Sequence, residues 1–270
     1  MSASEHHLKS LQAIRAYELR QALAFFPVPA PGRTVTVLEL GAGTGQQALM
    51  LRDAGYEVSA VDLPSSHYHD ARVFEVEDYD GRTLPFAEGA FDIVFSSNVL
   101  EHVADIDRIL DETRRVLKRN GHAVHVLPSS SCRLWSIPGH YLWLARRVLQ
   151  RVSTSTKAPV EGENSLAIPK TPSGFDEWRK TLFPSRHGER GNVLTETFYF
   201  SRSWWSGTFR KGGFEAVTTQ STGIFYTMCN SFAHKLSISR RQSLSFLLGS
   251  SCHIYVLRKL NHAPDKGVYR

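Results

Sequence analysis

A glycine-rich turn is the first part of the chain whose residue types and spacing could do chemistry. Glu39, Gly41, Gly43 and Gly45 fall within VLELGAGTG, directly before a segment of helical character. Glycine permits positive φ and close approach of a ligand to the backbone, and the amides at a helix N-terminus attract a carboxylate or phosphate. A dinucleotide-binding G-x-G-x-x-G turn would need glycine at the position of Gln46, so this departure disfavours a nicotinamide cofactor.

Acidic residues follow this turn at the ends of predicted strands. Asp62 ends the second strand, where an acceptor-only carboxylate can bind both hydroxyls of a ribose, although the same residue would also serve a nicotinamide dinucleotide. A second acid, Asp80, opens DGRTLPFAEGAFDIVFSSNVLEHV. In that segment FDIVF is typical of a buried strand, and NVLEHV opens the next helix.

These segments carry a specific resemblance. VLELGAGTG followed by DGRTLPFAEGAFDIVFSSNVLEHV resembles the type 11 family of class I methyltransferases over residues 35–127. The resemblance implies S-adenosylmethionine as cofactor and methyl transfer as activity. It also implies that Asp80 accepts a hydrogen bond from the adenine amino group, with Gly81 and Arg82 supplying backbone contacts. Asp78 is the alternative to Asp80, since the preceding strand could end earlier.

Three side chains lie just past FDIVF, where the family brings cofactor sulfonium and acceptor together. Asn98 is expected to contact the cofactor, and His102 to act as the catalytic base, because an unperturbed histidine pKa lies near neutral pH. The alternative is that His102 only packs at the helix start, since a sulfonium is already activated and alignment can supply much of the rate. Some relatives hold a divalent metal with an acid-x-x-Glu-His arrangement. Asn98 replaces that acid here, so no metal is expected and Glu101 is interpreted as structural.

Alternating strands and helices must position these residues. Short β-branched runs predict strands, and apolar residues at helical spacing predict helices. Strands are predicted at 34–40, 56–61, 72–76, 91–96, 122–127, 214–219 and 253–258, and helices at 5–26, 46–55, 105–117 and 203–211. Periodicity and resemblance together predict a Rossmann-like α/β fold: a seven-stranded, mostly parallel sheet with helices on both faces and the ligand at the strand C-termini.

The regular alternation stops after the fifth strand. We therefore divide the chain into an N-terminal helix (1–30), an S-adenosylmethionine-binding core (31–127), a substrate-determining insertion or lid (128–200) and the C-terminal part of the sheet (201–270). The insertion is too long for an ordinary connection. It contains the basic amphipathic segment HYLWLARRVLQRV, which predicts either a lid helix or a peripheral contact with a membrane.

Charge is distributed unevenly along the chain. Residues 1–130 carry 12 Lys and Arg against 18 Asp and Glu, whereas residues 131–270 carry 20 against 8 and all five tryptophans. The second half therefore predicts either a basic, aromatic surface for an anionic ligand or simply a solvated basic face. The three cysteines lack a C-x-x-C spacing, and no signal peptide or membrane span is recognised, so a cytoplasmic protein, peripheral to a membrane at most, is expected.

The acceptor is less well determined than the cofactor. We expect a small molecule or a saccharide or lipid-linked group, with oxygen as the methylated atom and a phosphate or other anion for the basic half. A nucleic acid ranks last, because the sequence contains no recognised RNA-binding module and its basic residues are dispersed. A non-catalytic, S-adenosylmethionine-binding regulatory subunit remains the alternative of another class. Turnover with any acceptor would eliminate it.

Overall fold

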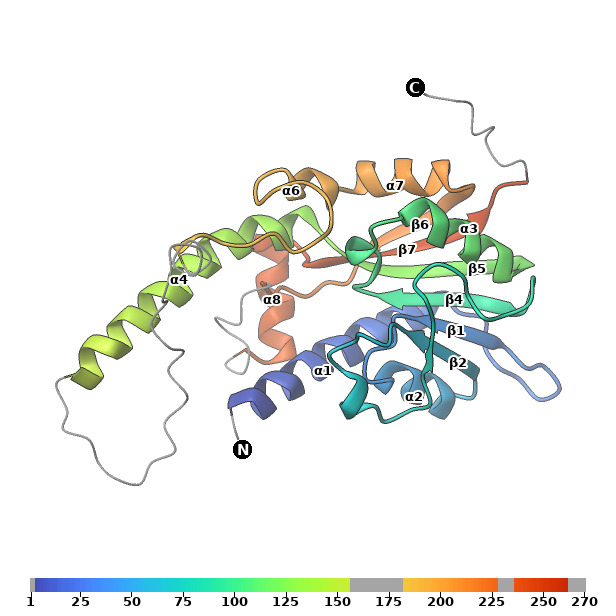
Figure 1. Ribbon diagram of the computed structural model, residues 1–270, viewed down its shortest axis with the longest axis horizontal. Helices are drawn as coiled ribbons and strands as arrows, with labels where there is room; N and C mark the ends of the chain where they lie inside the picture. Colours follow the sequence, from blue (N-terminus) through green and yellow to red (C-terminus); the bar gives the residue numbers. More distant parts are fainter. Residues whose placement is uncertain (1–2, 156–181, 228–235, 262–270) are drawn as a thin grey trace.

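One seven-stranded sheet organises the described part of the chain, which comprises residues 3–155, 182–227 and 236–261 of a computed structural model. The strands are β1 (Thr36–Leu40), β2 (Glu57–Asp62), β3 (Glu77–Asp78), β4 (Phe91–Ser97), β5 (Leu117–Pro128), β6 (Phe214–Ser221) and β7 (Cys252–Lys259). Their order is β3-β2-β1-β4-β5-β7-β6, and β7 pairs antiparallel with both neighbours while the other pairs are parallel (Figure 1). The predicted mostly parallel α/β fold is confirmed.

Helices cover both faces of this sheet. The described helices are α1 (Ala3–Ala22), α2 (Gln46–Asp53), α3 (Ile106–Val116), α4 (Ser130–Ser155), α6 (Glu196–Tyr199), α7 (Arg202–Lys211) and α8 (Ile238–Leu248). Short 3-10 turns lie at Leu23–Phe25, His69–Ala71 and Leu100–His102, the last of which is η3. One buried cluster packs α1 and α2 against the sheet, and another packs α3 and α7 against the opposite face.

The third strand differs from its prediction. We predicted it at residues 72–76, but only Glu77 and Asp78 pair with β2. The preceding residues turn over the glycine loop instead: the Val73 amide donates to the Thr44 carbonyl at 2.8 Å, and Phe74 packs beside Gly45. Contact with the loop therefore overrides the strand preference of this β-branched segment.

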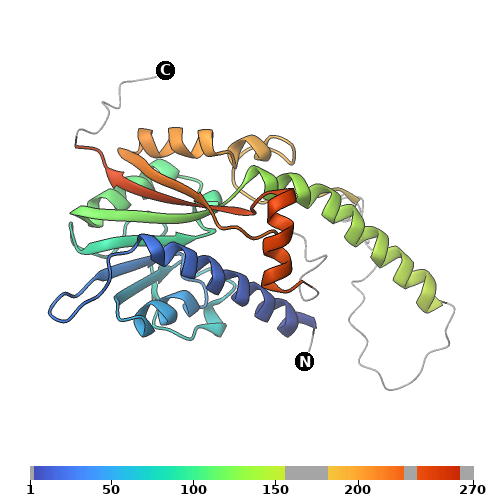
Figure 2. The ribbon, with the colours of Figure 1, turned by 180° about the vertical axis from the view of Figure 1, so that it is seen from behind.

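The C-terminal ends of the parallel strands are covered by α1, α4 and α8. Figure 2 shows α4 starting at this edge and extending away from the sheet. The Trp135 indole N–H donates to the Leu248 carbonyl at 2.9 Å, which ties α4 to α8, and the Gln242 amide donates to the Tyr17 hydroxyl at 3.1 Å, which ties α8 to α1. Among the described helices, none is long and apolar enough to cross a membrane. Peripheral contact through α4 therefore stays a prediction.

Candidate active site

The loop between β1 and α2 requires its glycines. Gly41, Gly43 and Gly45 have φ values of 71°, 58° and 73°, the left-handed region in which a side chain is strained. A Cβ at Gly41 would lie 2.5 Å from a Val99 methyl carbon, and one at Gly45 would lie 2.7 Å from the Phe74 Cβ. The loop therefore leaves no room for a side chain at two of these positions.

Asp62 holds this loop to the end of β2. Its two carboxylate oxygens accept hydrogen bonds from the Gly43 amide at 2.9 Å and the Leu63 amide at 2.8 Å. Each oxygen has a second lone pair, so the carboxylate can still accept from ribose hydroxyls. A Cβ at Gly81 would lie 3.0 Å from Leu63, which places the predicted adenine-contacting loop beside Asp62.

Glu39 lies beneath the loop at the end of β1. Only 1% of the residue is exposed, and its Oε2 atom has no hydrogen-bond partner among the described residues. Burial raises the pKa of Glu39 to about 8, and a hydrogen bond from the Ala48 amide offsets only part of that rise. The carboxyl group is therefore protonated at neutral pH and leaves one oxygen unpaired beneath the loop.

Asp80 forms its own turn at the protein surface. Its Oδ1 atom accepts hydrogen bonds from the Arg82 amide at 2.8 Å and the Thr83 amide at 2.7 Å. These two bonds hold the pKa of Asp80 below its usual value. Asp78, the alternative, instead pairs with Arg72 at 2.7 Å. Each acid keeps its Oδ2 atom free of hydrogen bonds to described residues, so the choice of Asp80 over Asp78 as the adenine contact stays a prediction.

A pocket lies between the glycine loop and α1. It is lined by Leu11, Gln12, Arg15, Ala16, Gly41, Ala42, Gly43, Thr44, Gln46, Gln47, Met50, Tyr68, Ser97 and Asn98. Three predicted cofactor residues, Gly41, Gly43 and Asn98, thus meet in one pocket. The other predicted site residues do not line it: Glu39, Gly45, Asp62, Asp80, Gly81 and His102. The contribution of α1 and of Tyr68, whose ring lies 3.4 Å from where a Gly43 Cβ would be, was not foreseen. A leading amphipathic helix gives no sequence signal that its polar face borders a ligand.

Arg15 joins the pocket to the buried interior. Its Nη1 atom donates to Glu18 at 2.6 Å and to the Tyr226 hydroxyl at 3.1 Å, and that hydroxyl donates to the other Glu18 oxygen at 2.8 Å. The Gln47 side chain donates to the Arg15 carbonyl at 3.1 Å. This network fixes α1 over the glycine loop.

Asn98 marks the strained end of β4. Its φ of 56° is the only positive value for a non-glycine residue in the described ranges. The Asn98 amide donates to the Val126 carbonyl at 2.8 Å, and the Cys252 thiol lies 3.6 Å from its Oδ1 atom. Strain of this kind concentrates at binding and catalytic sites, which agrees with the predicted role of Asn98.

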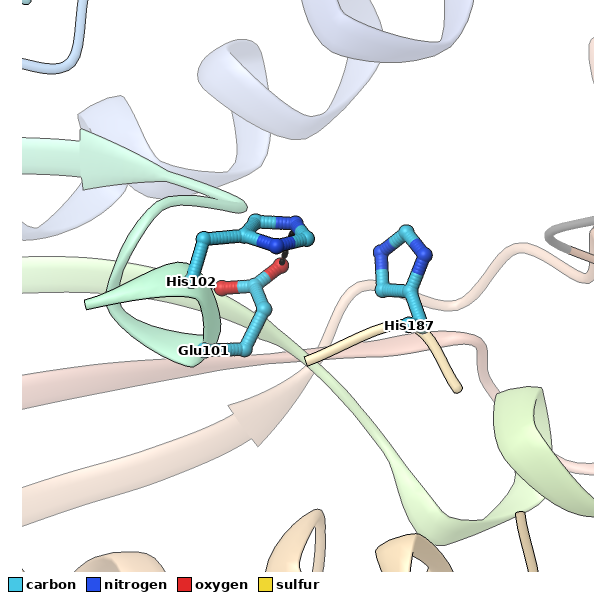
Figure 3. Close-up of side chains that lie close together, drawn as sticks. All are labelled: Glu101, His102 and His187. Atoms are coloured by element: carbon cyan, nitrogen blue, oxygen red, sulfur yellow. Dashed lines mark ion pairs between the residues drawn. The ribbon is translucent and has the colours of Figure 1, made fainter. Parts of the chain in front are cut away.

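Just beyond Asn98, three potential ligand side chains converge (Figure 3). Glu101 and His102 come from η3, and His187 comes from the predicted insertion. The His102 Nε2 and Glu101 Oε1 atoms are 3.8 Å apart, and the two imidazole centroids are 4.7 Å apart. The side chain of Glu101 is fully buried, whereas that of His102 is 45% exposed.

Burial changes the protonation of all three groups. It raises the pKa of Glu101 to about 8 and lowers the pKa of His102. It also lowers the pKa of His187 to about 3, with the nearby His102 and Arg133 acting in the same direction. Both imidazoles are therefore neutral at neutral pH, and each can accept a proton or donate a lone pair.

A buried ion pair holds His187 in place. The Glu196 Oε1 atom accepts from the His187 and Gly188 amides, both at 2.7 Å, while Arg133 lies 3.0 Å from the Oε2 atom. The Glu189 amide donates to the Glu101 carbonyl at 2.9 Å. The insertion is therefore hydrogen-bonded directly to η3, a contact that separation in sequence concealed.

Comparisons with known proteins agree with this arrangement. Residues 38–125 match the model of a methyltransferase domain family. An uncharacterized methyltransferase of Mycolicibacterium gilvum is 39% identical over 98 residues, which is 34% of this chain and 38% of that protein. A malonyl-[acyl-carrier protein] O-methyltransferase of Erwinia pyrifoliae is 33% identical over 98 residues, covering 35% of this chain and 37% of that protein. The alignments thus span well under half of these relatives.

The fold comparison extends further along the chain. The structure of an S-adenosylmethionine dependent methyltransferase from Mesorhizobium loti superposes with a TM-score of 0.52 and 15% identity, covering 90% of this chain and 98% of that one. Residues 38–125 therefore match a methyltransferase domain, and the chain as a whole shares the fold of the methyltransferase from Mesorhizobium loti. The glycine loop, which leaves no room for a Cβ at Gly41, fits the close approach of S-adenosylmethionine to the backbone.

Proposed function

We propose that this protein transfers the methyl group of S-adenosylmethionine to a hydroxyl oxygen of a small-molecule or saccharide acceptor. The observation that supports this most strongly is the pocket beneath α1, where Gly41, Gly43 and Asn98 meet. Asp62 stands beside that pocket to take the ribose, and His102 follows Asn98 by one turn. Asp62 would thus hold the ribose of the cofactor, and Asn98 and His102 would lie toward its sulfonium.

The chain would contribute mainly alignment and a proton acceptor. When bound, the cofactor supplies an activated methyl: the acceptor oxygen bonds to the methyl carbon as the carbon–sulfur bond breaks, and the hydroxyl proton must leave. His102 is half exposed and neutral at neutral pH, because burial lowers its pKa, so it can take that proton. The positive φ of Asn98, which lines the pocket, turns the chain just before η3.

A second cavity supports an anionic acceptor. It has a volume of about 640 Å³ and is bordered by the N-terminus of α4, by Arg202 and His253, and by several serine hydroxyls. A helix N-terminus and a guanidinium both attract negative charge. Phe200 lines this cavity and also packs against His187, with ring centroids 6.4 Å apart. The cavity therefore adjoins the cluster that contains the candidate base.

Trp205 does not belong to the aromatic surface that the sequence suggested. Trp205 is 1% exposed and stacks on Phe209 with centroids 5.5 Å apart. It belongs to the core between α7 and the sheet. Of the predicted cation and aromatic segment, Phe200 and Arg202 border the second cavity.

Cofactor binding is the first test. Isothermal titration with S-adenosylhomocysteine should give saturable binding, NADH should give none, and Asp62→Ala should weaken the former at least ~100-fold. Glu57→Gln, an exposed change on the same strand, is the matched control. Binding of NADH alone would refute the proposal.

Turnover is the second test. Release of S-adenosylhomocysteine should be measured across alcohol acceptors that do or do not carry a phosphate or carboxylate. The proposal expects turnover with the anionic members, and Arg202→Ala should raise their KM more than it lowers kcat. Tight cofactor binding without turnover on any acceptor would favour a regulatory protein instead.

A further inference from the structure

The cluster of Glu101, His102 and His187 has an electrostatic problem that the described residues do not solve. Both Glu101 carboxylate oxygens are buried, and neither has a hydrogen-bond partner among those residues. A buried carboxyl without partners costs several kcal/mol whether it is ionised or merely desolvated. An unpaired buried group of this kind calls for an explanation, and a bound ion is one that the neighbouring donors allow.

The spacing of the three donor groups suits a shared cation better than direct bonds between them. One donor atom from each side chain lies within 4.8 Å of the other two. The 3.8 Å between His102 Nε2 and Glu101 Oε1 is too long for a hydrogen bond. Ligands at about 2.1 Å from a tetrahedral ion lie roughly 3.4 Å apart, so small side-chain rotations would bring all three atoms onto one ion.

We propose that Glu101, His102 and His187 bind a divalent transition-metal ion. Two neutral imidazoles and a carboxylate are ligands that ions of the zinc, iron and cobalt type accept. Three protein ligands leave at least one coordination position for a small molecule, as at catalytic rather than structural sites. The sequence disfavoured a metal because Asn98 replaces an acid, but the third donor comes from the insertion.

The surroundings of His187 are those of a positioned ligand. Glu196, which is paired with the buried Arg133, accepts a hydrogen bond from the His187 amide. Two residues later, the Glu189 amide donates to the Glu101 carbonyl. Outer partners of this kind orient metal ligands, and their removal typically weakens binding about 10–100-fold. His102, the most exposed of the three, leaves one side of the cluster open toward solvent.

The role of the ion, unlike its binding, rests on the proposed function. An acceptor hydroxyl bound to the ion would lose its proton to solvent more readily, because a cation lowers the pKa of bound oxygen. That oxygen would then form its bond to the methyl carbon while the carbon–sulfur bond breaks. In this arrangement His102 would be a metal ligand rather than a general base.

Cobalt binding tests the site directly. Full-length protein without an added histidine tag, stripped with a chelator, should be titrated with Co²⁺ while its visible absorption is followed. We expect saturable d–d bands with about one equivalent of Co²⁺. His187→Gln and Glu101→Gln should each weaken binding at least ~100-fold, which exceeds the usual loss from an outer partner. His122→Gln is the matched control, because His122 lies in β5, paired with Ile93 of β4, and is not part of the cluster. This change should leave Co²⁺ binding unchanged.

Each sample should also be titrated with S-adenosylhomocysteine and unfolded thermally. The absence of Co²⁺ binding in folded, cofactor-binding wild type would overturn the metal site and leave the proposed function intact. Equal Co²⁺ binding by folded His187→Gln would also overturn it. Co²⁺ binding without any cofactor binding would support the metal site while refuting the proposed function.

Discussion

Replacing Glu39 by glutamine should change how the stability of the ligand-free protein depends on pH. Burial raises the pKa of Glu39 to about 8 from an ordinary value of about 4.5. The folded protein therefore keeps a proton that the unfolded chain releases. Stability accordingly falls as pH rises from about 4.5 to about 8, and Glu39 adds no pH dependence outside that window.

The size of the effect follows from these two values. Each pH unit inside the window costs about 1.4 kcal/mol, so the wild type should lose roughly 2.5 kcal/mol through Glu39 between about pH 5 and pH 7. Glutamine has nearly the shape of the protonated acid and does not titrate. At pH 7 Glu39→Gln should therefore be about 3 kcal/mol more stable than the wild type.

Urea unfolding of both proteins, without cofactor, at several pH values between about 5 and 8 measures this difference. The contribution of Glu101, whose pKa burial also raises, is common to both proteins and cancels in the comparison. Glu57→Gln on β2 is the exposed control and should follow the wild type. Parallel stability curves for wild type and Glu39→Gln would refute the argument that Glu39 is buried without a charge partner.

Three further changes test the loop, the insertion and the base. Gly45→Ala should destabilise the protein by about 2–5 kcal/mol, because positive φ and the close Phe74 act together; an unfolding midpoint equal to wild type would contradict this. Arg133→Met should cost about 3–5 kcal/mol by leaving Glu196 buried without its cation, with urea unfolding as the measurement and an unchanged midpoint as the contrary result. His102→Ala should lower kcat with cofactor affinity retained, and unchanged kcat would leave alignment alone as the source of rate.

Local patterns in the sequence predicted most of the fold. The β-branched runs and the glycine turn each depend on neighbours a few residues away, and β1, β2 and β4 lie within two residues of their predicted limits. The predicted position of the third strand was wrong because Phe74 packs against Gly45, and no local sequence pattern predicts that contact. The glycine loop was predicted because its signal is local. The contact of α1 with the pocket was not predicted, because it joins segments that are distant in sequence.

The insertion shows why sequence reasoning stops short of the acceptor. His187 belongs to no recognised metal-binding motif, and its partners on η3 are about 85 residues earlier in the chain. Only folding brings it against Glu101, with Glu196 and Arg133 holding the loop. The part of the chain that borders the serine-lined cavity thus also completes the three-residue cluster. Acceptor choice and any metal dependence should therefore change together in variants of the insertion, while binding of S-adenosylhomocysteine, which depends on the glycine loop, stays constant.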